Sequence, residues 1–327
     1  MSKTITFGAL ANVTLAVTPF SITATASSGL AVTFVSTTPS VCTVSGNIVS
    51  DIAAGTCSIT ATQAGNGTYA PAQPVMQSFT VIGPAITPGG IVPIDSTVTT
   101  IQPGEWASIY GTNLASSTAL YSGSLPYPTS LGGTTVMIDG KPAFLYYVSP
   151  TLIDLITPAD TATGSVPVAV ITSAGTASAS VTLSQFGPSF FLLDSKHVAG
   201  IILRTNGSGT QGGGTYDFLG PTGNSLGYTT VAAKAGDIVE LFANGLGPTN
   251  PAVPAGQGSS GAAPATDPVT LLINNVSVTP SYAGASSEAG IYQINVTIPA
   301  GLGTGDVSLV AIVGGAQSPS TVVISLQ

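Results

Sequence analysis

The feature that most constrains this chain is an internal repeat in its second and final thirds. The matched segments are residues 103–114 with 235–246, 135–140 with 270–275, and 152–159 with 293–300, at offsets of 132, 135 and 141. The last offset continues without a gap, so that it equates Leu183 with Ile324. The offset grows only where Gly, Pro and Ser are abundant, which places the insertions in loops. Two copies of one structural unit are therefore predicted.

Alternation of apolar and polar residues predicts that this unit is a β-sandwich. Short alternating runs such as 58–62 and 307–313 recur along the chain, each bounded by Gly, Pro, Asn or Asp, and no apolar stripe with a helical period is sustained. Short strands separated by turn residues are typical of sandwiches. We predict an all-β chain of three immunoglobulin-like (Ig-like) β-sandwich modules in series, the second and third being the repeat.

Breaks at residues 82–90 and 186–189, both rich in Gly and Pro, predict where the modules meet. The predicted domains are 1–82, 83–186 and 187–327. Residues 194–232 fit neither copy of the repeat and contain a Gly-rich loop at 208–214. We interpret this segment as an extra hairpin at the N-terminus of the third module, with strands at 198–203 and 216–219.

The charge composition excludes several classes of partner. The 327 residues include only 5 Lys and Arg against 13 Asp and Glu, a net charge of −8. A nucleic-acid-binding protein needs a basic patch, which five scattered basic residues do not make. No apolar run reaches the 18 residues of a membrane-spanning helix, so no membrane insertion is predicted. No signal peptide is visible at the start, and we expect the chain to be a fragment of a longer exported protein.

Two cysteines, Cys42 and Cys57, lie in strand-like segments on either side of a Ser-Gly-Asn turn at 45–47. His197 is the single histidine, so a zinc site is excluded. A disulfide is the favoured interpretation, and two buried free thiols on adjacent strands are the alternative. The bond would close a loop of about 15 residues, contribute roughly 3 kcal/mol, and imply an oxidising compartment.

The first 82 residues resemble a bacterial Ig-like module that occurs in tandem in large secreted proteins. The matching segments are 5–8, 24–30, 32–34, 41–44, 53–61 and 63–66. The resemblance implies the same disulfide between Cys42 and Cys57.

Residues 84–184 resemble an IPT/TIG-type Ig-like domain, and residues 84–327 resemble the C-terminal region of uncharacterised secreted acidobacterial proteins. The matching positions of the first are Gly104, 111–114 and 149–151, and those of the second are 147–150, 235–237, 244–248 and 292–296. These resemblances imply fold and export and assign no activity.

No catalytic, cofactor-binding or metal-binding group is predicted, and the chain is not expected to be an enzyme. Asp194, Lys196 and His197 form the densest ionisable cluster and are the first candidates if any group reacts. A calcium site at a module junction, using Asp160, Asp194 or Asp217, is left open. Glycines such as Gly111 and Gly245 are interpreted as turn positions that need positive φ.

Aromatic residues are concentrated in the second module. Trp106 and Tyr110 lie in phase on one strand and are both predicted to face the core. Tyr121 and Tyr127 fall in the insertion at 121–128, where they are expected to be exposed and to offer possible contacts for a sugar ring.

These observations favour a non-enzymatic structural or adhesive segment of an extracellular or cell-surface bacterial protein, with a glycan or another surface protein as partner. One alternative is a carbohydrate-binding module. The other is a self-assembling fibre subunit, because the strand at 321–326 carries no Lys to guard an open edge and invites strand addition.

Overall fold

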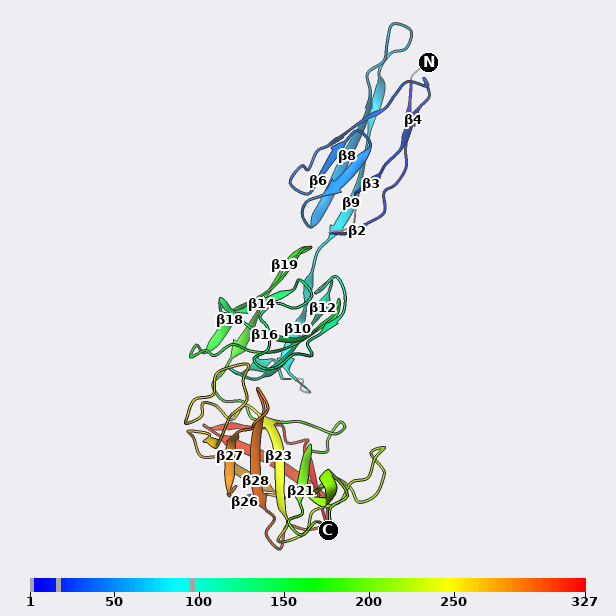
Figure 1. The fold of residues 1–327 in the computed structure, drawn as a ribbon. Coiled ribbons are helices and arrows are strands. Elements are labelled where there is room, and N and C mark those ends of the chain that lie inside the picture. Colours follow the sequence, from blue (N-terminus) through cyan, green and yellow to red (C-terminus); the bar gives the residue numbers. More distant parts are fainter. Residues whose placement is uncertain (1–2, 16–18, 95–97) are drawn as a thin grey trace.

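The computed structural model describes residues 3–15, 19–94 and 98–327 and is built almost wholly of strands. Figure 1 shows three sandwiches strung end to end, with the N-terminus in the first and the C-terminus in the third. The predicted all-β fold of three Ig-like sandwiches is confirmed. Among the described residues the only helical element is a 3-10 turn at Gly212–Gly214, and none of the helical structure is long and apolar enough to cross a membrane.

Strands β1 to β9 form the first module. They are β1 (Ile5–Phe7), β2 (Val13–Thr14), β3 (Phe20–Ser21), β4 (Ala24–Ala26), β5 (Thr33–Ser36), β6 (Cys42–Ser45), β7 (Ile48–Asp51), β8 (Gly55–Gln63) and β9 (Ala72–Ile82). One sheet has the order β2-β9-β8-β5 and a second the order β3-β7-β6, with β1 paired to β4. Strand β8 shows why the sequence folds this way, since Cys57, Ile59 and Ala61 are fully buried while the Ser and Thr residues between them face outward.

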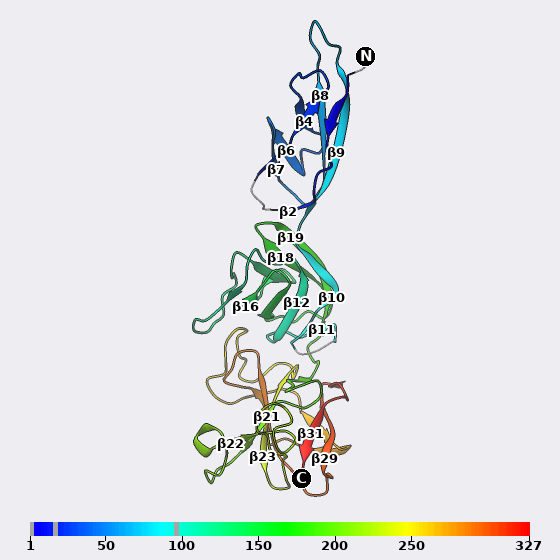
Figure 2. The same cartoon turned by 90° about the vertical axis from the view of Figure 1, so that its right-hand side faces the viewer.

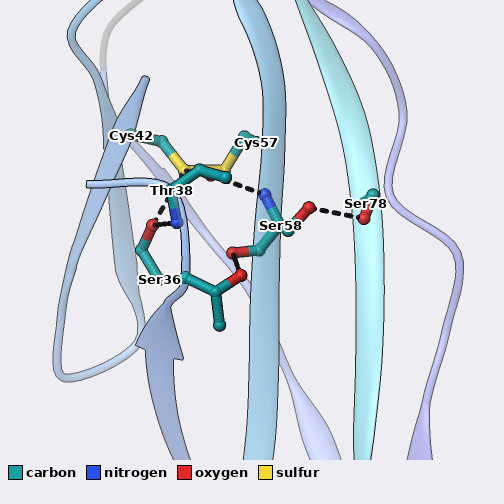
Figure 3. The surroundings of a disulfide bond; sticks show 7 residues. Ser36, Thr38, Cys42, Cys57, Ser58 and Ser78 are labelled. Carbon is teal, nitrogen blue, oxygen red and sulfur yellow. Dashed lines mark hydrogen bonds between the residues drawn. A yellow bond between two sulfur atoms is a disulfide. The ribbon is translucent and has the colours of Figure 1, made fainter. Parts of the chain in front are cut away.

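A disulfide joins Cys42 and Cys57 in the core of this module, as the sequence predicts (Figure 3). The two residues belong to different sheets, because Cys42 begins β6 and Cys57 lies on β8. Beside the bond, the Ser58 N–H donates to Thr38 Oγ1 at 2.9 Å. The covalent bond thus ties the two layers of the sandwich together, and in the described residues no cysteine is left free.

Strands β10 to β19 form the second module. They are β10 (Ala85–Pro93), β11 (Thr100–Ile101), β12 (Trp106–Thr112), β13 (Ala119–Leu120), β14 (Thr135–Ile138), β15 (Lys141–Pro142), β16 (Phe144–Val148), β17 (Leu152–Ile156), β18 (Gly164–Thr172) and β19 (Gly175–Leu183). Two five-stranded sheets, β10-β12-β17-β16-β13 and β11-β19-β18-β14-β15, enclose a core that includes Ile109, Leu155 and Val170.

Strands β20 to β31 form the third module. They are β20 (Ser189–Phe190), β21 (Gly200–Leu203), β22 (Tyr216–Phe218), β23 (Ile238–Asn244), β24 (Ala263–Pro264), β25 (Thr270–Ile273), β26 (Val276–Val278), β27 (Tyr282–Ala285), β28 (Tyr292–Thr297), β29 (Gly305–Val313), β30 (Ala316–Gln317) and β31 (Val323–Leu326). One sheet contains β22-β21-β23-β28-β27-β24 with β20 beside β23, and the other contains β26-β25-β29-β30 with β31 beside β29. The two sheets share one core.

Strand registers confirm the repeat. Ala107 pairs with Leu155 in the second module, and the equivalent Val239 pairs with Val296 in the third. The last part of the predicted offset is wrong, however. Gly164 pairs with Leu183, whereas its equivalent Gly305 pairs with Leu326 and not with Ile324. The segment between β30 and β31 holds two extra residues compared with the second module. The sequence comparison misses them because apolar residues still match apolar residues after a shift of two positions.

The extra hairpin of the third module, β21 with β22, forms where the sequence predicts strands, but its place in the module differs from the prediction. The module begins with β20, whose Ser189 pairs with Asn244 as Ala85 of β10 pairs with Thr112 in the second module. The hairpin follows β20 and is therefore an insertion and not an N-terminal addition. The same pairing makes Gly83-Pro84 and Gly187-Pro188 equivalent linkers.

The segment 321–326 is not an open edge. Strand β31 pairs with β29 on one side. On its other side Val323 bridges His197 and Leu326 bridges Ala233, both in parallel. The backbone groups that would recruit another strand are bonded within the chain, so the prediction of an unguarded edge at this strand is wrong.

Candidate functional site

The junction between the second and third modules gathers the buried polar and aromatic groups that the sandwich cores do not use. Figure 2 shows the third module lying below β11 and β12 of the second. Trp106, the first residue of β12, donates its indole N–H to the Ala289 carbonyl at 2.8 Å and packs with Ile156 and Ala289. The third module thus closes over the end of β12.

Trp106 and Tyr110 do not face the core of their own module, contrary to the prediction. Ala107 and Ile109 occupy that core, so the alternate residues of β12 lie on the opposite face. Trp106 is only 9% exposed because Ala289 of the neighbouring module and aromatic rings of its own module pack against it, whereas Tyr110, farther along the strand, is 47% exposed. The sequence supplies the alternation but not its phase, since both faces of this strand carry apolar residues.

Glu105 is the most unusual group at the junction. Its side chain is buried, with 2% of the residue exposed, and Oε1 accepts the Gly245 N–H of the third module at 2.6 Å. The other oxygen, Oε2, is buried and has no hydrogen-bond partner. Burial raises the pKa of Glu105 well above its usual value, and the Gly245 N–H opposes this only in part.

Gly245 makes this close approach possible. It has φ of +80°, and a Cβ here would overlap the Gly187 carbonyl of the linker. The Gly187 N–H in turn donates to the Gly245 carbonyl at 3.1 Å. The linker and the Glu105 carboxyl therefore meet on the two sides of one residue.

A cleft of about 170 Å³ opens beside these groups. Its walls are mainly apolar, formed by Pro103 and Ala159 of the second module and by Pro248, Val253 and Ile291 of the third. Two acidic residues, Asp160 and Glu288, also line it. No sequence motif marks the cleft, because its walls come from separate segments spread over residues 103–292 of two modules.

Asp160 is bound from one side only. Its Oδ1 lies 2.6 Å from Lys141 Nζ and accepts the Ala162 N–H at 2.9 Å, while Oδ2 is buried and without a partner. Burial alone would raise the pKa of Asp160, but the bonds from Lys141 and Ala162 outweigh it and lower the pKa below its usual value. An ionised carboxylate whose second oxygen is buried thus lies in the wall of the cleft.

Tyr121 and Tyr127, the predicted ligand contacts, lie together in a row of rings. The ring centroids are 5.8 Å apart, and Tyr127 continues the row to Tyr146 and Trp106 at 5.6 and 5.5 Å. Every contact is edge-to-face, and both residues are half-buried, not exposed. The row extends the apolar contact at the junction outward and leaves part of each tyrosine at the surface.

The side chains of Asp194, Lys196 and His197 are engaged in contacts that hold the local structure together. His197 is buried with Nδ1 2.8 Å from Asp194 and Nε2 3.0 Å from Asp306, which Lys196 also contacts at 2.7 Å. Ser325 donates to Asp306 and not to the imidazole. Because both ring nitrogens face carboxylates, neither is placed to take a proton from a nucleophile. Asp306 is the partner that sequence reasoning missed.

The three candidate calcium ligands are each engaged by a different basic side chain. Asp160 contacts Lys141, Asp194 contacts His197, and Asp217 contacts Arg204 Nε at 2.7 Å. Within residues 3–15, 19–94 and 98–327, no three His, Cys, Asp or Glu side chains are placed to hold a metal ion. The structure therefore does not bring these acids together.

Comparison with known proteins adds a likeness of fold. No family model and no curated protein matches the chain. Among solved structures, SGBP-B from the mixed-linkage glucan utilization locus of Bacteroides ovatus, in complex with a mixed-linkage heptasaccharide, is 13% identical with a TM-score of 0.32, over 100% of this chain and 70% of that one. An intimin fragment is 13% identical with a TM-score of 0.23, over 56% and 99%. An I-band fragment of titin is 11% identical with a TM-score of 0.21, over 100% and 99%.

Proposed function

We propose that this chain is a stiff, non-enzymatic structural or adhesive segment of an extracellular or cell-surface bacterial protein. The observation that carries the proposal is the buried junction of the second and third modules. Trp106 and Glu105 both bond to backbone groups of the next module and are almost fully covered by it. Ordinary flexible modules meet through polar, loosely packed contacts and move relative to one another.

The first junction supports the same function. Strand β9 ends at Ile82 and β10 begins at Ala85, so only two residues separate the strands. Asn113, itself at a φ of +53°, donates its side-chain N–H to the Gly83 carbonyl at 3.2 Å. A two-residue linker that contains proline and is held from the side has little freedom to bend.

The disulfide supports export. Structural disulfides persist in oxidising compartments, and the bond between Cys42 and Cys57 is sealed in the core of the first module. The surface uses Ser, Thr and Gly in place of charged residues, a composition common in secreted bacterial surface modules.

Small-angle X-ray scattering on the full chain tests the stiffness. We expect a narrow distribution of end-to-end lengths that salt does not alter. Inserting four Gly-Ser residues between Gly187 and Pro188 should broaden the distribution, while the same insertion in the loop at 208–214 should not. A broad distribution for the unmodified chain would contradict the proposal.

A second candidate function is carbohydrate binding at the cleft. The favouring observation is a cleft with apolar walls that the acidic residues Asp160 and Glu288 also line, because sugar rings offer both hydroxyl donors and apolar faces. Tyr121 and Tyr127 remain proposed contacts beside it.

Glycan-array binding of the full chain tests this second candidate. Binding should be lost in Asp160→Asn and reduced in Tyr127→Ala. It should be unchanged in Tyr228→Ala, a partly exposed tyrosine of the third module that does not line the cleft. Binding that survives both of the first two changes would place the sugar site elsewhere.

A further inference from the structure

A carboxyl group sealed between two modules is a costly arrangement unless it carries a proton. Glu105 has one oxygen bonded to the Gly245 N–H and one buried oxygen with no donor. Two other buried oxygens have no partner: Gln102 Oε1, three residues before Glu105, and Asn244 Oδ1, on the residue before Gly245. A proton on Glu105 removes the charge and adds one donor to a region that holds unsatisfied acceptors.

We propose that Glu105 is a proton-operated latch between the second and third modules. With its proton, the carboxylic acid stays buried and the modules stay docked. When the proton leaves, the carboxylate requires water, and the junction opens at the 184–188 linker to supply it. The latch consists of Glu105 and Gly245, with Trp106 alongside.

The charges around the latch do not compensate for a buried carboxylate. On the side of the second module, Lys141 is already paired with Asp160. On the side of the third module the titratable groups are Tyr292, whose pKa burial and Glu105 both raise, and the exposed Glu288. Among the described residues, the group that favours ionised Glu105 is the Gly245 N–H. An ion formed here has to be solvated by movement of the modules.

The sign of the pH dependence follows from the direction of the shift. The pKa of Glu105 is raised in the docked state above its value in water. Docking is therefore fully stable below the ordinary pKa of a glutamate, near about 4.3, and weakens as the pH rises through the raised value. Opening is therefore expected at a higher pH than the ionisation of an exposed glutamate.

The chain contains its own reporter of this motion. Trp106 is the only tryptophan and is buried by the third module next to Glu105. Its fluorescence is recorded on the full chain from about pH 5 to about pH 9.5, below the ordinary pKa of tyrosine. We expect the emission to shift to the red as the pH rises, with unchanged far-ultraviolet circular dichroism and an increased radius of gyration in scattering.

Two variants decide the origin of the shift. Glu105→Gln keeps the shape and removes the ionisation, so its emission should stay constant across the range. Glu240→Gln is the matched control, since the pKa of Glu240 is also raised by burial but this residue lies in the middle of β23, away from the linker. It should keep the full transition. If Glu105→Gln does not fold, the transition of the unmodified chain still tests the latch.

Three results would overturn the proposal. The first is a constant emission of the unmodified chain over the whole range. The second is a transition that persists in Glu105→Gln. The third is a transition accompanied by loss of β-sheet signal, which would mean unfolding of a module and not opening of the junction.

Discussion

Gly245 and Gly111 are fixed in different ways, although the sequence suggests one explanation for both. Gly245 does have positive φ, as predicted. Gly111 does not belong to the positive-φ residues; a Cβ at this position would overlap the Ala85 carbonyl of the neighbouring strand. The prediction for Gly111 is thus wrong, because close backbone approach selects glycine as strictly as an unusual φ does.

The close approach at Gly245 gives a stability prediction. Gly245→Ala should destabilise the docked junction by about 1–3 kcal/mol from φ strain, with the overlap on Gly187 in addition. Gly236→Ala is the matched control, because Gly236 has φ of +85° but open space around it. The control should show the strain alone. Thermal melts followed by Trp106 emission measure the difference, and equal effects of the two changes would contradict the packing argument.

Acid should loosen the segment that holds His197. Bonds from Lys196 and from Ser325 and His197 lower the pKa of Asp306 to about 2 despite burial. The pKa of Asp194 is also about 2, since the N–H groups of His197 and Lys196 outweigh burial. The unfolded value is about 3.9, so this stabilisation is present above that pH and is lost as the pH falls towards 2.

Hydrogen exchange of residues 194–199 measures this loss. Exchange should accelerate as the pH falls from about 4 to about 2, after correction for the intrinsic rate. In Asp306→Asn the segment should already exchange quickly at neutral pH and change less on acidification. Equal protection at both pH values in the unmodified chain would contradict the expectation.

Sequence reasoning reaches some single residues and not others, for physical reasons. The Cys42–Cys57 pair is predictable because no other cysteine competes. Asp194, Lys196 and His197 are predictable as a cluster because they are neighbours in sequence, but Asp306 is 109 residues from His197. Glu105 gives no signal at all, since its partner is a backbone N–H 140 residues away.

At the scale of elements, register is what the repeat predicts best. Ile138 pairs with Val168, and its equivalent Ile273 pairs with Leu309, as the offsets of 135 and 141 require. The β30–β31 segment escapes the prediction because two added residues keep the period of two, so the inward positions stay apolar. The phase of β12 escapes it because a module interface, and not solvent, covers the second face.

Removing the inter-sheet disulfide should weaken only the first module. Cys42→Ala with Cys57→Ala opens a loop of 15 residues, and we expect a loss of about 3 kcal/mol. Urea unfolding measures the change when it is followed by the nuclear magnetic resonance signals of the Phe79 ring and the Val49 methyl groups. Both side chains are buried in this module. The unfolding transition followed by Trp106 emission should occur at the same urea concentration as in the unmodified chain. A shift of this transition to lower urea would contradict the independence of the modules.

The β21–β22 hairpin depends on one buried cation. Arg204 contacts Asp217 at 2.7 Å and Asp237 at 2.8 Å, and both carboxylates are almost fully buried. Arg204→Leu should destabilise the third module by about 3–5 kcal/mol, because two buried negative charges lose their partner. The triple change with Asp217→Asn and Asp237→Asn should recover part of this. A calorimetric melt of the full chain measures both, and an unchanged melt of Arg204→Leu would contradict the buried-pair argument.

At the scale of the whole molecule, the two copies of the repeat use the same two positions differently. One carboxyl oxygen of Glu105 in the second module accepts from the backbone of the next module, whereas the carboxylate of the equivalent Asp237 pairs with Arg204 of its own module. Trp106 is covered by a neighbour, whereas the equivalent Ile238 is 40% exposed. The far end of the third module therefore lacks the open carboxyl and the indole with which the second module binds its successor.

The order of the modules is therefore not interchangeable, because the second module can dock a successor in a way that the third cannot. Suppose that a second copy of the third module were appended after Gln327. It would face an Asp237 that already pairs with Arg204 and an Ile238 in place of Trp106, so we expect that it would not dock. Exchanging Asp237 and Ile238 for Glu and Trp would not suffice, since Arg204 and the β21–β22 hairpin would still hold the site. A longer rod with the same docked junction would thus call for copies of the second module, because that module carries Glu105 and Trp106 where the third carries Asp237 and Ile238.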